Sequence, residues 1–168
     1  MRAQRKDQRR QATVMAVGVM LAAGTAGGEG PELALINESP SLPRGLYLRT
    51  AGPVVGGAIV AFDQPATARA YLGRIGMPGE VLLLKRVAAV DGDRVCAGDG
   101  LVRAPGRQVR TLDRDRQGAA LSAWRGCRRL EPDEVFVLGD TPESFDSRYF
   151  GPVRKSATRG VYREVMTW

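Results

Sequence analysis

Two serines that lie one residue apart, Ser39 and Ser41, have the spacing and surroundings of residues that could do chemistry. They occur in the segment NESPSLPRGLY (37–47). A serine hydroxyl becomes a nucleophile when a neighbouring base removes its proton. Pro40 and Pro43 each fix φ near −65°, which would stiffen this segment. Two interpretations remain open at this point: a serine held in a fixed pose for catalysis, or a proline-stiffened linker.

The base that such a serine needs cannot be histidine, because the chain contains none. This excludes a Ser-His-Asp triad, a Cys-His pair and any His-based zinc site. The 25 basic residues are 22 arginines and three lysines, Lys6, Lys85 and Lys155. Arginine stays charged at any relevant pH, whereas a buried lysine can lose its proton. A lysine in an apolar environment is therefore the candidate base.

Lys85 has such an environment, since it lies inside the apolar run VLLLKRVAAV (81–90). In a strand, side chains alternate between faces, so Leu83 and Val87 share the face of Lys85. Desolvation between these aliphatic groups would lower the pKa of Lys85, and a neutral amine can act as a general base. The alternative is that Lys85 extends its amine to solvent from the end of a strand.

A third polar group lies in GDTPESFDSRYFG (139–151), which brings Ser144, Asp146, Ser147 and Arg148 close together in sequence. A serine hydroxyl beside a neutral lysine could orient the lysine amine. The alternative is a local turn followed by a surface Asp–Arg pair. No motif suggests a metal or cofactor, and we expect neither.

The elements that must position these residues are mostly short strands. Strands are expected at 45–49, 54–62, 81–90 and 134–138, and the last strand elements within 145–153 and 160–168. One short helix is expected near 63–74. Many short strands with turn signals and little helix predict a mostly β domain, a small barrel or a coiled sheet.

The first 28 residues have the pattern of a membrane-targeting segment. Four arginines and one lysine fall in the first ten residues, and the seventeen residues 12–28 carry no charge. This stretch is at the short end of the roughly 17–25 residues that can span a bilayer. The basic head would place the chain after Glu29 outside the cytoplasm. A retained anchor, a cleaved signal peptide and a buried helix of a soluble protein all remain open.

The net charge of +7 bears on the choice of partner. Outside the basic head, the excess is scattered and forms no basic stripe interleaved with aromatic residues. This distribution favours lipid headgroups and argues against nucleic acid. We therefore divide the chain into a basic anchor or signal segment (1–28) and an extracytoplasmic domain (29–168).

Cys96 and Cys127 are the two cysteines of the chain. In an oxidising compartment they would form a disulfide that closes a loop of about 30 residues and contributes ~3 kcal/mol. The polar, arginine-rich segment between them, about 96–127, would then be a hairpin insertion held at its base. Two free thiols are the alternative.

Three of these stretches, in order, resemble the conserved boxes of the type I signal peptidases, which are Ser-Lys dyad proteases. They are SPSLP (39–43), LLLKRVAAVDGDRV (82–95) and GDTPESFDSRYFGPV (139–153), with GGAIVAF (56–62) as a weaker match. The first stretch, extended to NESPSLPRGLY, resembles the Asn-x-Ser-x-Ser-x-Pro-x-Gly-x-Tyr pattern of the TraF-type conjugative transfer signal peptidases. Pro43 follows Ser41 by two residues rather than the three of the housekeeping enzymes, which also favours the conjugation-type subgroup.

The resemblance implies a role for each polar residue. Ser41 would be the nucleophile and Lys85 the general base, while the Ser41 N–H and the Ser39 hydroxyl would form the oxyanion hole. Ser144 would position the Lys85 amine. Asp146 and Arg148 would hold the last loop in place, a structural role. Ser39 remains the alternative nucleophile.

The resemblance also implies a fold and a function. We expect a signal-peptidase-like coiled β-sheet or barrel with an N-terminal transmembrane helix, in the inner membrane with its catalytic domain on the periplasmic side. The expected activity is endopeptidase cleavage of signal peptides or propeptides from membrane-bound precursors, such as a conjugative pilin precursor. Two alternatives are a catalytically silent β-domain that acts as a scaffold in a secretion complex, and a relative of the Ser-Lys self-cleaving repressors. The expected anchor and the lack of a DNA-reading helix count against the repressor.

Overall fold

The computed structural model describes residues 32–168. The expected anchor or signal segment, 1–28, lies outside these residues. Within residues 32–168, none of the helices has the length and apolar character needed to cross a bilayer.

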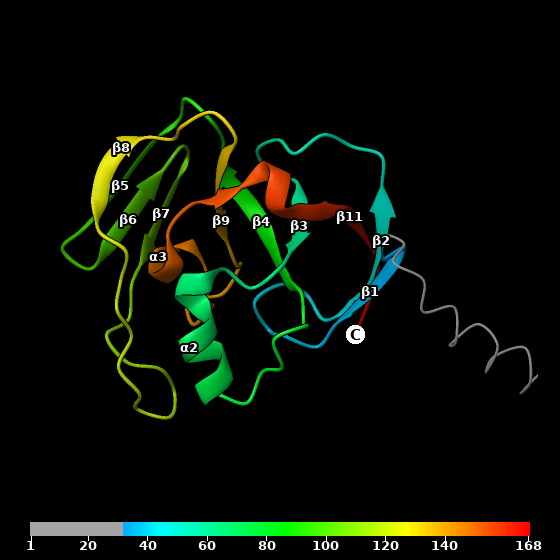
Figure 1. Cartoon of the computed structure of the whole chain (residues 1–168), viewed down its shortest axis with the longest axis horizontal. Coiled ribbons are helices and arrows are strands. Elements are labelled where there is room, and N and C mark those ends of the chain that lie inside the picture. Colours follow the sequence, from blue (N-terminus) through cyan, green and yellow to red (C-terminus); the bar gives the residue numbers. More distant parts are fainter. Residues whose placement is uncertain (1–31) are drawn as a thin grey trace, which may run out of the picture. The chain divides into compact units, whose positions relative to one another are not determined.

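The larger of two sheets carries the candidate base. Its seven strands are all paired antiparallel, in the order β1-β2-β11-β3-β4-β9-β10, and the sheet is curled (Figure 1). The expectation of a mostly β domain with a coiled sheet is confirmed. The strands are β1 (Ala34–Asn37), β2 (Gly45–Thr50), β3 (Ile59–Phe62), β4 (Leu83–Ala89), β9 (Glu134–Leu138), β10 (Val153–Arg154) and β11 (Thr158–Thr167).

The smaller sheet is built from the arginine-rich insertion. Its order is β7-β6-β5-β8, with β5 (Arg94–Gly98), β6 (Leu101–Ala104), β7 (Arg107–Arg110) and β8 (Gly126–Arg129). Cys96 and Cys127 lie directly opposite each other on β5 and β8, and a disulfide joins them. Figure 1 shows this sheet at the opposite end of the described domain from β1 and β2.

Apolar residues from both sheets share one core cluster. Ala89, Phe136 and Leu138 of the large sheet pack with Val95 and Val102 of the small sheet. A second cluster lies under the helix α2 (Ala66–Arg74), whose Ala68 and Leu72 are buried against the large sheet. The two sheets are therefore joined by burial of apolar surface as well as by the chain.

The segment 145–153 differs from the sequence-based expectation. It was expected to contribute strand, but residues Ser147–Phe150 form a short helix, α3, and only Val153–Arg154 pair as a strand. The reason is local capping, since the Asp146 carboxylate accepts a hydrogen bond from the Arg148 N–H at the start of the helix. Gly151, with φ of 80°, ends it. The remaining helical turn, η1 (Lys155–Ala157), precedes β11.

Candidate active site

The two serines lie in the connection between β1 and β2, which we call the serine loop (residues 38–44). Asn37 and Gly45 pair across its base. Ser41 is 4% exposed, and the next residue, Leu42, is buried in the core cluster that includes Tyr47. The loop is thus seated in the domain by an apolar side chain, which argues against a solvated linker.

Lys85 lies in the middle of β4, paired with Val60 of β3, and is also 4% exposed. Leu83 and Val87 on the same face belong to the main core cluster. The amine is therefore enclosed, and the alternative of an amine that extends to solvent does not apply.

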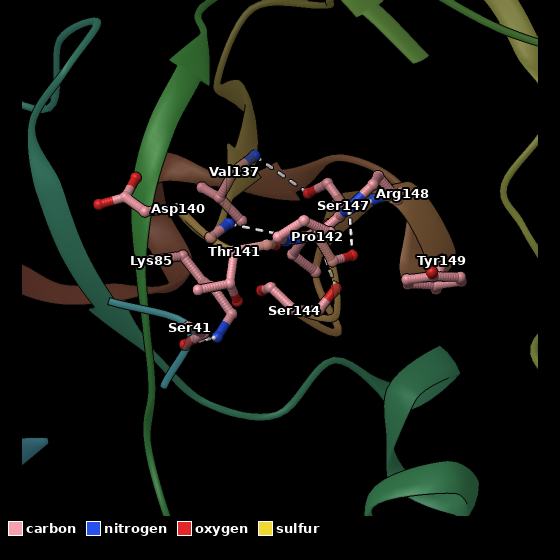
Figure 2. Close-up of polar contacts among 12 residues, drawn as sticks. Ser41, Lys85, Val137, Asp140, Thr141, Pro142, Ser144, Ser147, Arg148 and Tyr149 are labelled. Carbon is pink, nitrogen blue, oxygen red and sulfur yellow. Dashed lines mark hydrogen bonds and ion pairs between the residues drawn. The ribbon is translucent and has the colours of Figure 1, made fainter. Parts of the chain in front are cut away.

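The Lys85 amine meets the serine loop directly. Its Nζ lies 2.7 Å from Ser41 Oγ, in a buried hydrogen bond (Figure 2). Burial lowers the pKa of Lys85 from the ordinary 10.5 to about 8, a shift that the carboxylate of Asp146 opposes and the charge of Arg148 reinforces. The pair therefore combines a hydroxyl with an amine that is neutral in about a tenth of molecules at pH 7 and in about half at pH 8.

The Ser39 hydroxyl makes its two hydrogen bonds within residues 32–168 with Ser41. It donates to Ser41 Oγ at 3.0 Å, and the Ser41 N–H donates to Ser39 Oγ at 3.3 Å. Within residues 32–168, no hydrogen bond joins Ser39 and Lys85. The amine thus meets Ser41 rather than the alternative nucleophile.

Ser144 lies on the loop after β9, where its hydroxyl faces the Lys85 side chain (Figure 2). Its Oγ is buried and has no hydrogen-bond partner within the described residues, so the expected bond to Lys85 is not formed in this structure. Gly139 makes room for this hydroxyl, because a Cβ at that position would lie 2.1 Å from Ser144 Oγ.

Asp146 and Arg148 form an ion pair whose side chains are 0% and 1% exposed, with Oδ2 and Nη2 2.8 Å apart. The Asp146 carboxylate also accepts from the Gly139 N–H at 2.8 Å. The Arg148 guanidinium donates to the carbonyl oxygens of Thr141, Pro142 and Ser144, which lie on the same loop (Figure 2). The pair therefore ties the loop that carries Ser144 to α3.

Two further residues position the site and were not singled out from the sequence. The Asp140 N–H donates to the Ser41 carbonyl oxygen at 2.6 Å, and Arg107 of the small sheet donates to the Gly139 carbonyl oxygen at 2.7 Å. The Gly-Asp pair at 139–140 was recognised only as a turn. Nothing in the local sequence of Arg107 indicates that its side chain reaches a residue 32 positions away.

Ser41, Lys85 and Ser144 line a cavity of about 800 Å³. One side is formed by residues 35–39 and another by residues 81–84, so that backbone segments flank the pair. The remaining wall comes from α2, the loop after β7, the loop after β9 and α3. It combines apolar and aromatic side chains with charged ones such as Asp115 and Glu143; the apolar and aromatic residues include Tyr71, Leu72, Leu112, Leu121, Phe145 and Tyr149. A cavity of this volume, with apolar and aromatic side chains in its wall, is large enough for a peptide segment with apolar side chains.

No cluster of three potential metal ligands occurs within residues 32–168. The chemistry that the side chains themselves offer is a hydroxyl, an amine of lowered pKa and nearby hydrogen-bond donors. This is the minimal set for acyl transfer through a serine ester.

The chain belongs to the signal peptidase family, peptidase S26, whose family model matches residues 8–168. Among its relatives, a plasmid transfer protein TraF from Escherichia coli is 34% identical over 170 residues, covering 94% of this chain and 95% of the relative. A probable conjugal transfer protein TraF from Sinorhizobium fredii is 34% identical over 170 residues, covering 93% and 86%. The resemblance inferred from the three boxes is confirmed.

Among solved structures, a signal peptidase I from Enterococcus faecalis shows some similarity to this chain. It is 22% identical in sequence and has a TM-score of 0.40, covering 67% of this chain and 98% of that one.

Proposed function

We propose that this protein is a serine endopeptidase that removes signal peptides or propeptides from exported precursors by a Ser41–Lys85 dyad. One observation carries the proposal: the buried contact of 2.7 Å between Lys85 Nζ and Ser41 Oγ inside a cavity large enough for a peptide segment. Membership of the signal peptidase family supports the reaction class.

In the proposed reaction, neutral Lys85 takes the proton of Ser41 as Oγ attacks the carbonyl carbon of the scissile peptide bond. The C–N bond then breaks, and the leaving amine takes that proton from Lys85. Water next attacks the Ser41 ester, gives a proton to Lys85, and releases the new carboxyl end. The Ser41 hydroxyl is restored when Lys85 returns the proton.

The negative charge that develops on the carbonyl oxygen needs hydrogen-bond donors. The Ser41 N–H and the Ser39 hydroxyl are the proposed donors, and in the free protein they are occupied by each other and by Ser41 Oγ. The carbonyl oxygen of a bound substrate would accept hydrogen bonds from both donors in place of these partners. Ser144, whose buried hydroxyl has no hydrogen-bond partner among residues 32–168, is the proposed acceptor that holds the Lys85 amine in line.

The proposed substrate is a membrane-bound, pilin-like precursor or another protein of a conjugative transfer apparatus. The support is the similarity to relatives named as plasmid and conjugal transfer proteins. We further propose that the protein is anchored in the inner membrane and that its domain acts on the periplasmic side. The basic N-terminal head and the Cys96–Cys127 disulfide, which suits an oxidising compartment, support this placement.

The test is intact-mass analysis of a pilin-like precursor co-expressed with the wild-type protein or with a variant. Wild type should shorten the precursor, Ser41→Ala and Lys85→Met should not, and Ser39→Ala should slow the reaction by about 10²–10³. Ser156→Ala is the matched control, since it removes an exposed serine hydroxyl that bonds Asp133, away from the cavity. Cleavage by Ser41→Ala at the wild-type rate would overturn the assignment of the nucleophile.

A further inference from the structure

The side-chain amide of Asn37 makes an unusual set of contacts with the serine loop. Its Nδ2 lies 2.9 Å from the Ser39 carbonyl oxygen, 3.1 Å from that of Leu42 and 2.9 Å from that of Pro43. Its Oδ1 accepts from the Ser39 N–H at 3.2 Å. One amide therefore spans the loop from its second residue to its sixth.

Three features make these contacts specific rather than incidental. Asn37 is 8% exposed and its bond to the Leu42 carbonyl oxygen is buried, so that little water competes for the amide at this contact. The acceptors come from both limbs of the loop, on either side of Ser41. The asparagine itself ends β1, where it is paired with Gly45 of β2, so that the amide is fixed to the sheet.

The loop needs such a fixed point because the bonds between its two serines do not provide one. Ser39 and Ser41 bond each other, and those bonds would survive if the whole loop shifted. Among residues 32–168, three other bonds hold the loop backbone from outside, and each reaches one limb or the centre of the loop. The Asp140 N–H donates to the Ser41 carbonyl oxygen, the Tyr47 hydroxyl donates to the Pro43 carbonyl oxygen at 2.7 Å, and the Trp168 N–H donates to the Arg44 carbonyl oxygen at 3.1 Å. Asn37 is the contact that joins both limbs.

We propose that Asn37 is a positioning residue that holds Ser41 Oγ within hydrogen-bond distance of the Lys85 amine. It acts through the loop backbone and touches neither reacting atom. The inference deepens the proposed peptidase function and rests on it for its biological meaning. The contact between Ser41 and Lys85 is nevertheless measurable without any substrate, which allows the two ideas to fail separately.

The test measures the coupling between position 41 and Lys85 in a Ser41→Cys background. Because Cys96 and Cys127 form a disulfide, the introduced thiol is the one free thiol of the chain. Its rate of alkylation by iodoacetamide is followed against pH by intact mass, with and without Lys85→Met. The difference between the two pH profiles is the coupling, measured as a double-mutant cycle.

With Asn37 present, Lys85→Met should change the pH midpoint of alkylation by about one unit or more, since the amine and the thiol would be in direct contact. In the Asn37→Leu variant, we expect Lys85→Met to change the pH midpoint by less than about a third of the change seen with Asn37 present. Asn37→Asp separates hydrogen bonding from packing. It keeps the size of the side chain and the acceptor for the Ser39 N–H, but sets a carboxylate against three carbonyl oxygens, and the coupling should be lost here too.

Gln64→Met is the matched control. Gln64 is 3% exposed, and its amide donates to the Pro78 and Val81 carbonyl oxygens at 2.6 and 3.2 Å. Loss of this amide should lower the unfolding temperature but leave the coupling intact. All alkylation is measured well below each variant's own unfolding temperature, so that a purely structural role would move only the unfolding temperature.

Retention of the full coupling in both Asn37→Leu and Asn37→Asp would overturn the inference, whatever the peptidase assay shows. Conversely, loss of coupling in both variants would support the inference even if the wild type cleaved no precursor, in which case only the proposed function would fall. Where cleavage is observed, Asn37→Leu should lower kcat by about 10- to 100-fold with little change in KM.

Discussion

At the scale of single residues, the site depends on an amine kept away from water. The residues on either side of Lys85 in the sequence are mostly aliphatic. Its strand, β4, lies between β3 and β9 in the large sheet. Burial removes water from the ammonium form and so favours the neutral amine. In this buried position the amine lies 2.7 Å from the hydroxyl of Ser41, the proposed nucleophile.

The lowered pKa of Lys85 predicts a pH dependence of stability that needs no substrate. The pKa is about 8 in the folded protein and near 10.5 when the lysine is exposed. The folded state therefore releases this proton at a lower pH than the unfolded state does. The free energy of unfolding should increase as the pH rises from about 8 to about 10.5. Lys85→Met should remove this gain, as measured by urea unfolding at several pH values. An identical pH dependence in wild type and Lys85→Met would contradict the prediction.

The same pKa predicts the pH dependence of peptidase activity. Only the neutral amine can accept the Ser41 proton, so kcat/KM should rise about tenfold per pH unit below pH 8 and level off above it. The measurement is the initial rate of precursor cleavage across pH 6 to about 9.5. A rate that falls on going from pH 6 to pH 8 would exclude Lys85 as the base.

Gly139 gives a third prediction at this scale. A Cβ here would lie 2.1 Å from Ser144 Oγ and 2.9 Å from the Ser41 carbonyl oxygen, so Gly139→Ala must displace one of the two loops. We expect the cleavage rate to fall by about 10²-fold, because misplacement of a catalytic group by about 1 Å has effects of this size. Gly73→Ala is the control. It adds a methyl group to α2 in open space, and a small gain in stability with unchanged activity is expected.

At the scale of elements, the loop after β9 is held by a charge pair rather than by regular structure. Asp146 caps α3 and also accepts a hydrogen bond from the Gly139 N–H. Arg148 donates hydrogen bonds to three carbonyl oxygens within residues 141–144. These contacts satisfy buried polar groups that would otherwise lack partners. The pair thus fixes the loop on which both Gly139 and Ser144 depend.

Breaking this pair should be costly. Asp146→Asn keeps the shape of the side chain but leaves the buried Arg148 guanidinium without its counter-charge, which we expect to lower the free energy of unfolding by about 3–5 kcal/mol. The comparison is Asp63→Asn, which breaks the exposed pair with Arg159 and should change stability little. Chemical denaturation of both variants measures the difference, and equal losses in the two would contradict it.

At the scale of the whole molecule, the two sheets are expected to unfold together. They share a core cluster, and Arg107 of the small sheet bonds the Gly139 carbonyl oxygen beside the site. The small sheet thus helps to support the loop after β9, which carries Ser144, and is not a separate appendage. The disulfide on β5 and β8 stabilises this arrangement by restricting the unfolded chain.

Replacing both cysteines, Cys96→Ser with Cys127→Ser, should lower the free energy of unfolding by about 3 kcal/mol, as expected for a bridge that spans 31 residues. Unfolding should remain a single transition, because the shared core couples the sheets. Urea unfolding followed by both Trp fluorescence and far-UV circular dichroism tests this, since Trp124 packs with the shared core cluster. Two separate transitions would show that the small sheet unfolds independently.

The sequence by itself indicated the residue types of the proposed catalytic pair and their local setting. A chain without histidine and with one lysine inside an apolar strand pointed to a serine and an amine as the reacting pair. Alternation along β4 correctly placed Leu83 and Val87 with Lys85, because strand periodicity is a local property. The order of three boxes was sufficient to indicate the signal peptidase family, to which the chain belongs.

Only the tertiary structure decided which groups meet. The contact between Ser41 and Lys85 spans 44 residues of sequence, and the bond from Arg107 to Gly139 spans 32. Residues 147–150 form a helix although a strand was expected, since one capping carboxylate outweighs a weak local preference. The amide of Asn37 finds its acceptors only once the serine loop is closed. Such contacts depend on strand pairing and loop closure at a distance, which local periodicity does not encode.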